Sequence, residues 1–383
     1  MPSIHPWHAP RIAAMIAYRP VSYPMSSCRH PLTIALIILL ALLLAAVAVT
    51  QLWVRYVERT YPPQGRFITV DRQRFHVLEQ GQGQPIVLIH GASTSARDYY
   101  PGLLQTLSKT HRVIAMDRPG HGYSDRHPRG VRKPVWPSPA GQAAALRRAL
   151  HSLAVYRPVL VGHSWGAAVT LAYLLDYPDD VAGGVLLGGV SHPWEGSVAS
   201  YNRIVGLPVL GDLFVNTVLL PFGWFAQPAG LRRVFSPNRV PDRYLDNTGL
   251  RLSLRPRVFQ HNAEDLGKLS AFLATQAPRY EHIKTPLLLI HGTEDTVVPA
   301  ADHPERLIKA VPQAHYVPLP GIGHAPHYAA PETVLQLILA FSRQVHGPIP
   351  NGAAGPERSV HNLSESAPDR SSTANTQPCS PLP

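Results

Sequence analysis

Residues 159–167 read Val-Leu-Val-Gly-His-Ser-Trp-Gly-Ala, a stretch that places a serine between two glycines. The apolar run at its start is typical of a buried strand, and the Ala- and Leu-rich segment after Gly166 is typical of a helix. Ser164 is therefore predicted to lie on a sharp strand-to-helix turn, where Gly162 and Gly166 lack the Cβ atoms that would clash. Such a turn exposes the serine hydroxyl at a helix N-terminus. We expect a nucleophile here, rather than an ordinary N-cap, provided that the chain supplies a histidine base and an acid.

Apolar runs alternate with helical patterns through most of the chain. Two short runs flank a turn at residues 71–73 and predict a hairpin, and six more follow, at 86–89, 113–116, 159–161, 185–187, 286–290 and 316–318. This alternation predicts an α/β fold with a doubly wound, mostly parallel sheet of eight strands. In such sheets, sites form beyond the carboxyl ends of the strands. His90, Asp117, Ser164 and Asp295 each follow a strand in this way.

The alternation stops between residues 191 and 278, where we expect an insertion of short helices that caps the site. Its apolar residues either favour an apolar acyl or aromatic substrate or only pack the cap onto the core. These residues are Leu207, Leu210, Phe214, Leu219, Leu220, Phe222, Trp224 and Phe225. Its arginines either lie against anionic lipid heads or form a solvated basic face. They are Arg232, Arg233, Arg239, Arg243, Arg251, Arg255 and Arg257.

Residues 32–54 are almost wholly apolar. At about 1.5 Å per residue, they are long enough to cross a hydrocarbon core of about 30 Å as a transmembrane helix or signal anchor. The alternative is a signal peptide that starts at Met25 and is cleaved after Ala46-Val47-Ala48, leaving a secreted or periplasmic protein. Arginines flank both ends of the span and do not orient it. We expect an uncleaved anchor, with the catalytic domain outside the cytoplasm.

The remaining composition limits the class of protein. The 383 residues are 45% hydrophobic and 15% charged, enough for a large core, which we place at residues 62–346. Residues 1–31 are expected to be irregular, and the Pro-, Ser-, Gly- and Asn-rich residues 347–383 to be a disordered tail. The net charge of +11 is scattered, which argues against nucleic-acid binding. Cys28 and Cys379 lie outside the predicted core, so no disulfide framework supports it.

Two further motifs supply an acid and a base. Residues 291–299 follow a predicted strand and contain Asp295, and residues 321–326 follow the last strand and contain His324. Glu294 competes with Asp295, and His327 with His324, but the motif positions favour Asp295 and His324. The chain order Ser, Asp, His is that of α/β-hydrolases.

From about residue 66 to residue 346 the chain therefore resembles the α/β-hydrolase superfamily, in the branch with a helical cap. The resemblance also draws on His90-Gly91 and on residues 117–124, a Gly- and Pro-rich stretch that we read as a rigid turn. It implies the catalytic residues Ser164, Asp295 and His324, and an oxyanion hole made by the backbone N–H groups of Ala92 and Trp165.

A carboxylic ester hydrolase that acts through a serine acyl-enzyme is the first functional hypothesis. The resemblance also allows a carbon–carbon bond hydrolase or a cofactor-free haloperoxidase, and a non-catalytic, membrane-tethered binding protein is a further alternative. Ser164 argues against dehalogenases and epoxide hydrolases of this superfamily, which have an aspartate at this position. His121, Asp125 and His127 do not form a convincing metal site, so we expect no metal and no cofactor.

Overall fold

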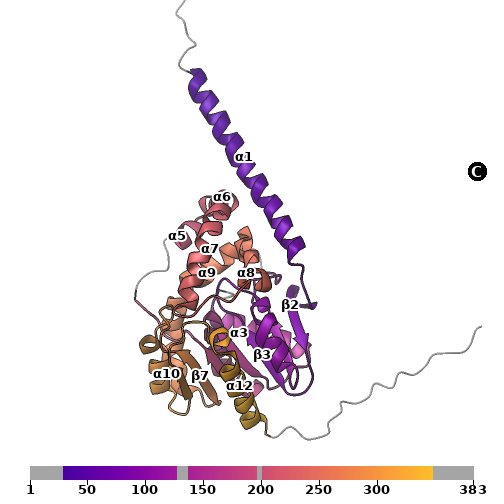
Figure 1. Ribbon diagram of the computed structural model, residues 1–383, viewed down its shortest axis with the longest axis vertical. Coiled ribbons are helices and arrows are strands. Elements are labelled where there is room, and N and C mark those ends of the chain that lie inside the picture. Colours follow the sequence, from indigo (N-terminus) through magenta and orange to yellow (C-terminus); the bar gives the residue numbers. More distant parts are fainter. Residues whose placement is uncertain (1–28, 127–136, 196–200, 348–383) are drawn as a thin grey trace, which may run out of the picture. The chain divides into compact units, whose positions relative to one another are not determined.

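Eight strands form one sheet in the computed structural model, which describes residues 29–126, 137–195 and 201–347 (Figure 1). The strands lie in the order β1-β2-β4-β3-β5-β6-β7-β8. β1 and β2 form the predicted hairpin, β2 is antiparallel to β4, and all other neighbours are parallel. The predicted mostly parallel sheet is confirmed. Its strands are β1 (Arg66–Val70), β2 (Gln73–Gln80), β3 (Pro85–Ile89), β4 (Arg112–Met116), β5 (Val159–His163), β6 (Gly183–Leu187), β7 (Leu287–Gly292) and β8 (His315–Leu319).

Helices cover both faces of the sheet because successive side chains of a strand point to opposite sides. From β3, Val87 and Ile89 pack in a cluster with residues of α3 (Pro139–Ser152), α4 (Trp165–Asp176) and α10 (Pro304–Ala310). Ile86 and Leu88 pack in a second cluster, with residues of α12 (Pro331–His346). The other core elements are η1 (Ala96–Tyr99), η2 (Tyr100–Leu104), α2 (Gln105–Leu107), η3 (Pro178–Asp180), η6 (Ala300–Asp302) and α11 (Pro326–Ala329). This is the doubly wound arrangement that the sequence predicts.

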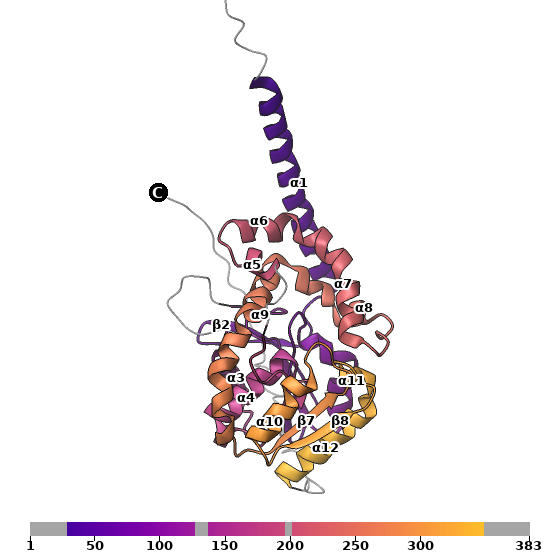
Figure 2. The ribbon, with the colours of Figure 1, turned by 90° about the vertical axis from the view of Figure 1, so that its left-hand side faces the viewer.

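The segment between β6 and β7 is helical (Figure 2). We expected only short helices here, but α7 has 17 residues and α9 has 21. α9 is long because Leu269 and Leu273, in its second half, are buried against the core cluster of α3 and α4. The elements are α5 (Tyr201–Val205), α6 (Leu210–Thr217), α7 (Leu219–Phe235), α8 (Tyr244–Thr248), η4 (Leu250–Leu254), α9 (Pro256–Gln276) and η5 (Ala277–His282).

One helix, α1 (Arg29–Thr60), precedes the sheet and is long and apolar enough to cross a membrane, or to serve as a signal sequence. It begins before residue 32 and ends after residue 54, the two predicted limits. The additional turns form because Val57 is fully buried against Leu252 of the cap, and Glu58 pairs with Arg255 at 2.8 Å. Apart from residues 29–31 and Gly347, the predicted irregular segment and tail lie outside the described residues.

The turn between β5 and α4 depends on two glycines. A Cβ atom on Gly166 would collide with the carbonyl oxygen of Ile89 on β3, and one on Gly162 would collide with the Thr170 hydroxyl and the Gly166 carbonyl. The helix therefore approaches the strands more closely than any residue with a side chain allows. This close approach fixes the position of Ser164 at the carboxyl end of the sheet.

We expect Gly166→Ala to lower the free energy of unfolding by about 3 kcal/mol, because the new methyl group meets backbone atoms that cannot move aside. Gly267→Ala is the matched control. Gly267 lies within α9, and a Cβ atom there would meet nothing beyond its own helix backbone within 4 Å, so alanine raises stability by about 0.5–1 kcal/mol. Chemical denaturation in detergent measures both. Equal stability of the two variants would contradict the steric account.

Candidate active site

Ser164 occupies the turn in a conformation that non-glycine residues rarely adopt, with φ 51° and ψ −117°. Its N–H donates to the carbonyl of Leu187 at 3.0 Å, and its carbonyl accepts from Ala167 at 3.0 Å and from Val190 at 3.3 Å. These bonds to β6, the loop after it and α4 hold the turn. The side chain remains partly exposed and lines a cavity.

The structure brings Ser164, His324 and Asp295 into one hydrogen-bonded row. His324 Nε2 lies 2.9 Å from Ser164 Oγ, and His324 Nδ1 lies 2.8 Å from Asp295 Oδ2. Asp295 follows β7 and His324 follows β8, and these strands are parallel neighbours, so the two loops meet at one edge of the sheet. This arrangement allows His324 to accept the serine proton while the carboxylate orients its ring.

Asp295 is fixed by several donors. Its Oδ1 accepts from the N–H groups of Val297 at 2.9 Å and Val298 at 2.8 Å, and His291 Nε2 lies 3.3 Å from Oδ2. Burial by itself would raise the pKa of Asp295, but the hydrogen bonds from His291 and His324 outweigh it and hold that pKa well below its usual value. These hydrogen bonds therefore favour the ionised carboxylate.

The two rival residues take other positions. Glu294 is exposed, whereas Asp295 is buried and contacts His324. His327 is buried on the far side of His163, where its Nε2 lies 3.8 Å from Asp98 Oδ2. The geometry thus supports Asp295 and His324 as the partners of Ser164.

Ala92 and Trp165 line the cavity beside Ser164, as an oxyanion hole requires. Trp165 is the first residue of α4, so its N–H has no acceptor within the helix. The loop that carries Ala92 is fixed by the next residue, Ser93, whose N–H donates to Asn262 Oδ1 of α9 at 2.6 Å. Asn262 Nδ2 donates in turn to Ser93 Oγ at 3.0 Å. Part of the cap therefore positions the loop of the candidate oxyanion hole.

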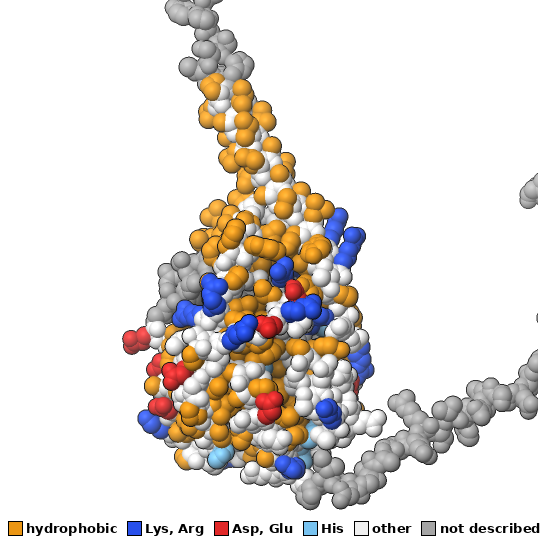
Figure 3. All heavy atoms as spheres, viewed as in Figure 1, with side chains coloured by type: hydrophobic (Ala, Val, Ile, Leu, Met, Phe, Trp, Pro, Cys, Tyr) orange, Lys and Arg blue, Asp and Glu red, His pale blue; other side chains and the backbone are white. Residues whose placement is uncertain are grey.

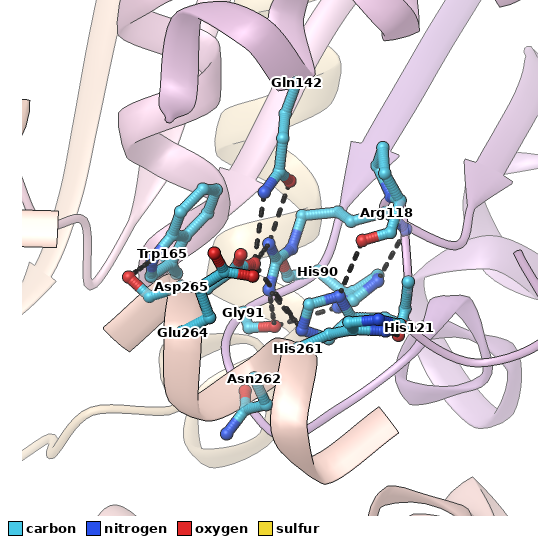
Figure 4. Close-up of polar contacts among 12 residues, drawn as sticks. His90, Gly91, Arg118, His121, Gln142, Trp165, His261, Asn262, Glu264 and Asp265 are labelled. Carbon is cyan, nitrogen blue, oxygen red and sulfur yellow. Dashed lines mark hydrogen bonds and ion pairs between the residues drawn. The ribbon is translucent and has the colours of Figure 1, made fainter. Parts of the chain in front are cut away.

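A buried cation that sequence reasoning missed lies under this loop (Figure 4). Arg118 follows β4, and its guanidinium donates to the carbonyls of His90 at 3.0 Å and Gly91 at 3.1 Å, to Gln142 of α3 at 2.9 Å and to Asp265 of α9 at 2.8 Å. It also stacks on the Trp165 ring, 4.2 Å from its centroid. Arg118 thus joins the oxyanion loop, the nucleophile helix and the cap.

Residues 117–124 do form a rigid turn, as expected. Asp117 is buried and accepts from the N–H groups of Ala96 at 2.7 Å and Tyr123 at 2.8 Å, while His76 Nδ1 lies 2.8 Å from it. Gly122 is required there, because a Cβ atom would collide with the Asp117 carboxylate. The sequence contains no short-range signal for Arg118 as a cap anchor, because its partner Asp265 lies 147 residues away.

Asp98, His163 and His327 are the one described group of buried side chains spaced for a metal ion, with one ligand atom each, all within 4.8 Å of one another. Asp98 already accepts hydrogen bonds from Tyr244 at 2.6 Å and Tyr328 at 3.3 Å. His163 Nε2 is 3.0 Å from the carbonyl of His324. The expected absence of metal and cofactor stays a prediction.

The cavity has a volume of about 700 Å³ and is lined by core loops and by the cap. Apolar side chains from the cap and the loops dominate its wall, and Arg233 is the one arginine or lysine among the described lining residues. The apolar ones include Val190, Trp194, Phe222, Leu231, Leu250, Leu254, Phe259, Leu266, Val298 and Tyr328. A cavity of this size and character fits a mostly apolar small molecule.

Comparison with known proteins agrees with this geometry. The chain belongs to the α/β hydrolase family, whose model matches residues 86–337. It is 23% identical to 2-hydroxy-6-oxo-6-phenylhexa-2,4-dienoate hydrolase of Burkholderia cepacia over 291 residues, 72% of this chain and 95% of that protein. Haloalkane dehalogenases are also among its relatives.

Two solved structures share the fold. The esterase RhEst1 from Rhodococcus sp. ECU1013 is 23% identical, with a TM-score of 0.54, over 73% of this chain and 98% of that one. A bacterial membrane phospholipase A is 20% identical, with a TM-score of 0.56, over 83% of this chain and 100% of that one. The relatives thus establish a hydrolase of this family and include more than one reaction.

We expect Arg118→Met to lower the free energy of unfolding by about 3 kcal/mol, because Asp265 stays buried with fewer partners. Arg126 still pairs with Asp265, which keeps the loss at the lower end for a broken buried pair. The control is Arg239→Met, whose pair with Asp242 is 87% and 83% exposed and whose loss changes stability by less than about 0.5 kcal/mol. Denaturant melts that coincide for the two variants would show that Arg118 does not anchor the cap.

Proposed function

We propose that the protein hydrolyses carboxylic esters with an apolar acyl or aromatic group, through a serine acyl-enzyme. The observation that carries the proposal is the row of hydrogen bonds from Ser164 through His324 to Asp295, which opens into an apolar cavity. Tethering by residues 32–54, with the catalytic domain outside the cytoplasm, belongs to the same proposal. The cavity argues against the non-catalytic alternative, in which the cap blocks the site.

In the proposed mechanism, His324 accepts the Ser164 proton as Oγ attacks the ester carbonyl carbon. The carbonyl oxygen gains negative charge, and the N–H groups of Ala92 and Trp165 stabilise it. His324 then protonates the departing alcohol, and the acyl group remains on Ser164. Water attacks the acyl-enzyme with His324 again as base, which releases the acid and restores the serine. Asp295 holds the neutral imidazole in the tautomer that accepts at Nε2, and it stabilises the imidazolium that forms between the two proton transfers.

Carbon–carbon bond hydrolysis is the second candidate, and its support is the Burkholderia cepacia relative and others named for such substrates. That relative's substrate is a dienoate, which carries a carboxylate. Arg233 is the one arginine or lysine among the described lining residues, and Asp98, Glu195 and Asp302 line the same cavity, so acidic groups oppose that carboxylate and this favours the ester. The cofactor-free haloperoxidase activity has no separate observation in its support.

We expect Ser164→Ala to lose labelling by a fluorophosphonate and to lose hydrolysis of p-nitrophenyl esters by about a millionfold. Esters of graded acyl length then define the substrate, and medium or long chains are expected to react faster than acetate because the cavity is apolar. Hydrolysis of the dienoate ring-fission product with no ester turnover would favour the second candidate. Wild-type protein that resists the label and turns over neither substrate would overturn both.

The acid is tested by a pair of neighbouring substitutions. Asp295→Asn is expected to lower kcat about ten-thousandfold, because the amide stabilises the wrong histidine tautomer. Glu294→Gln is the control and leaves kcat within a factor of about two, since Glu294 is exposed and does not contact His324. Equal losses in the two variants would remove Asp295 from the mechanism.

The pH dependence of kcat/KM is expected to rise from acid toward neutrality with a slope of one on a logarithmic plot. His324 must be neutral to accept the serine proton, so a protonated imidazole cannot act as the base. Asp295 adds no second proton, because its hydrogen bonds keep its pKa well below the usual value for an aspartate. A flat profile between about pH 5 and 7, or a slope of two, would contradict this assignment.

A further inference from the structure

A large apolar surface covers the outer side of the cap. Of the twelve exposed large hydrophobic residues that the structure describes beyond α1, nine lie within residues 204–225. Figure 3 shows hydrophobic atoms over this part of the molecule, next to α1. We call this surface the outer cap face. It consists of the eight that do not line the cavity, Ile204, Leu207, Val209, Leu210, Leu213, Val218, Trp224 and Phe225, of which Phe225 is 80% and Val209 75% exposed. Soluble monomeric proteins rarely expose so many neighbouring apolar side chains.

The contact between α1 and α6 determines where along α1 the outer cap face lies. Thr50 is buried, Gln51 Nε2 donates to Asn216 Oδ1 at 3.2 Å, and Trp53 packs against the cap cluster that contains Val205 and Val215. Residues 31–49 precede this contact and, at about 1.5 Å per residue, span about 28 Å, close to the thickness of the hydrocarbon core. If α1 crosses a membrane, α6 therefore lies where the helix leaves the hydrocarbon.

The charges around the outer cap face suit the same position. Arg55 and Arg59 on α1 are exposed just beyond the contact, and the Arg251 guanidinium lies 4.6 Å from the Trp224 ring centroid. Arginine and tryptophan are favoured at the boundary between lipid tails and headgroups. Within residues 204–225, Asp212 is the one charged residue, and its carboxylate accepts from Gln260 at 2.6 Å.

We propose that the outer cap face inserts into the surface of the bilayer that α1 crosses, so that the cap lies in lipid rather than in water. The exposed side of α7 carries Trp224 and Phe225, while Phe222 and Gly223 of the same helix line the cavity. One helix thus separates lipid from the cavity that contains Ser164. An apolar substrate dissolved in the bilayer then lies one helix away from the cavity.

Site-specific labelling of the full chain in phosphatidylcholine–phosphatidylglycerol vesicles tests the insertion. Cys28 and Cys379 are replaced by serine, and single cysteines are introduced as Leu39→Cys in α1, Leu210→Cys and Phe225→Cys on the outer cap face, and Tyr156→Cys as the control. Tyr156 is 65% exposed and lies between α3 and β5, outside the cap. Each cysteine carries the environment-sensitive fluorophore NBD, and brominated lipids act as quenchers.

We expect quenching by brominated lipid at positions 39, 210 and 225 and none at position 156. Quenching at 39 with water-exposed labels at 210 and 225 would overturn the proposal. Labels at 210 and 225 that leave water but resist lipid quenching would also overturn it, because a second copy of the chain then covers the face. A water-exposed label at position 39 would show that α1 does not cross the bilayer, and the proposal depends on that crossing.

A kinetic comparison separates this proposal from the proposed ester hydrolysis. The double variant Leu210→Asp and Phe225→Asp is expected to hydrolyse a vesicle-embedded long-chain ester at least tenfold more slowly than the control Tyr156→Asp, because charged side chains oppose insertion. Turnover of a water-soluble short-chain ester should be equal in both, since neither position lines the cavity. Equal rates on the embedded ester contradict the insertion. If neither ester is cleaved, the proposed function fails while the labels still decide the insertion.

Discussion

The close approach of α4 to β3 and β5 is the constraint on which this site depends. Without Cβ atoms at Gly162 and Gly166, the helix begins directly above the strands, and the residue between them takes a positive φ. Such a conformation costs of order 1–3 kcal/mol, so surrounding contacts must hold it. The bonds of Ser164 to Leu187 and Val190 tie the turn to β6 and the loop after it. These hydrogen bonds to the sheet therefore stabilise the strained backbone of Ser164.

The buried pair of Arg118 and Asp265 connects the core loops around this turn to the cap. Taking two charges out of water is costly, and the cost is recovered only when each has several partners. Arg118 has three carbonyl or amide oxygens besides Asp265, and Asp265 also binds Arg126 and Gln142. Because α9 contributes both Asp265 and Asn262, it fixes the loop of Ala92 from two sides. The cap is therefore part of the site's framework as well as its cover.

Local patterns were sufficient to predict the sheet, the turn at Ser164 and the loops that carry Asp295 and His324. Each of these depends on periodicity or on glycines within a few residues, so the sequence displays it directly. The lengths of α1 and α9 were not predictable in this way, because contacts with Leu252 and with the core cluster decide where they end. Arg118 was also missed. Its role requires Asp265 and Gln142, which come from two other helices, and no spacing along the chain indicates that they meet.

The environment of each apolar residue of the cap could not be predicted from the sequence. From sequence, they either contact substrate or pack the cap, and the structure divides them among three environments. Leu219 is fully buried within the cap, Phe222 lines the cavity, and Phe225 is exposed on the outside. All three lie on α7 at intervals of three residues, so each is rotated by roughly 60° around the helix from the one before, and their neighbours change accordingly. A helix that is apolar on all sides is normally buried on all sides. The cap interior and the cavity cover only part of this end of α7. In the proposed arrangement, the lipid beside α1 is a third neighbour of low polarity and covers the remaining side.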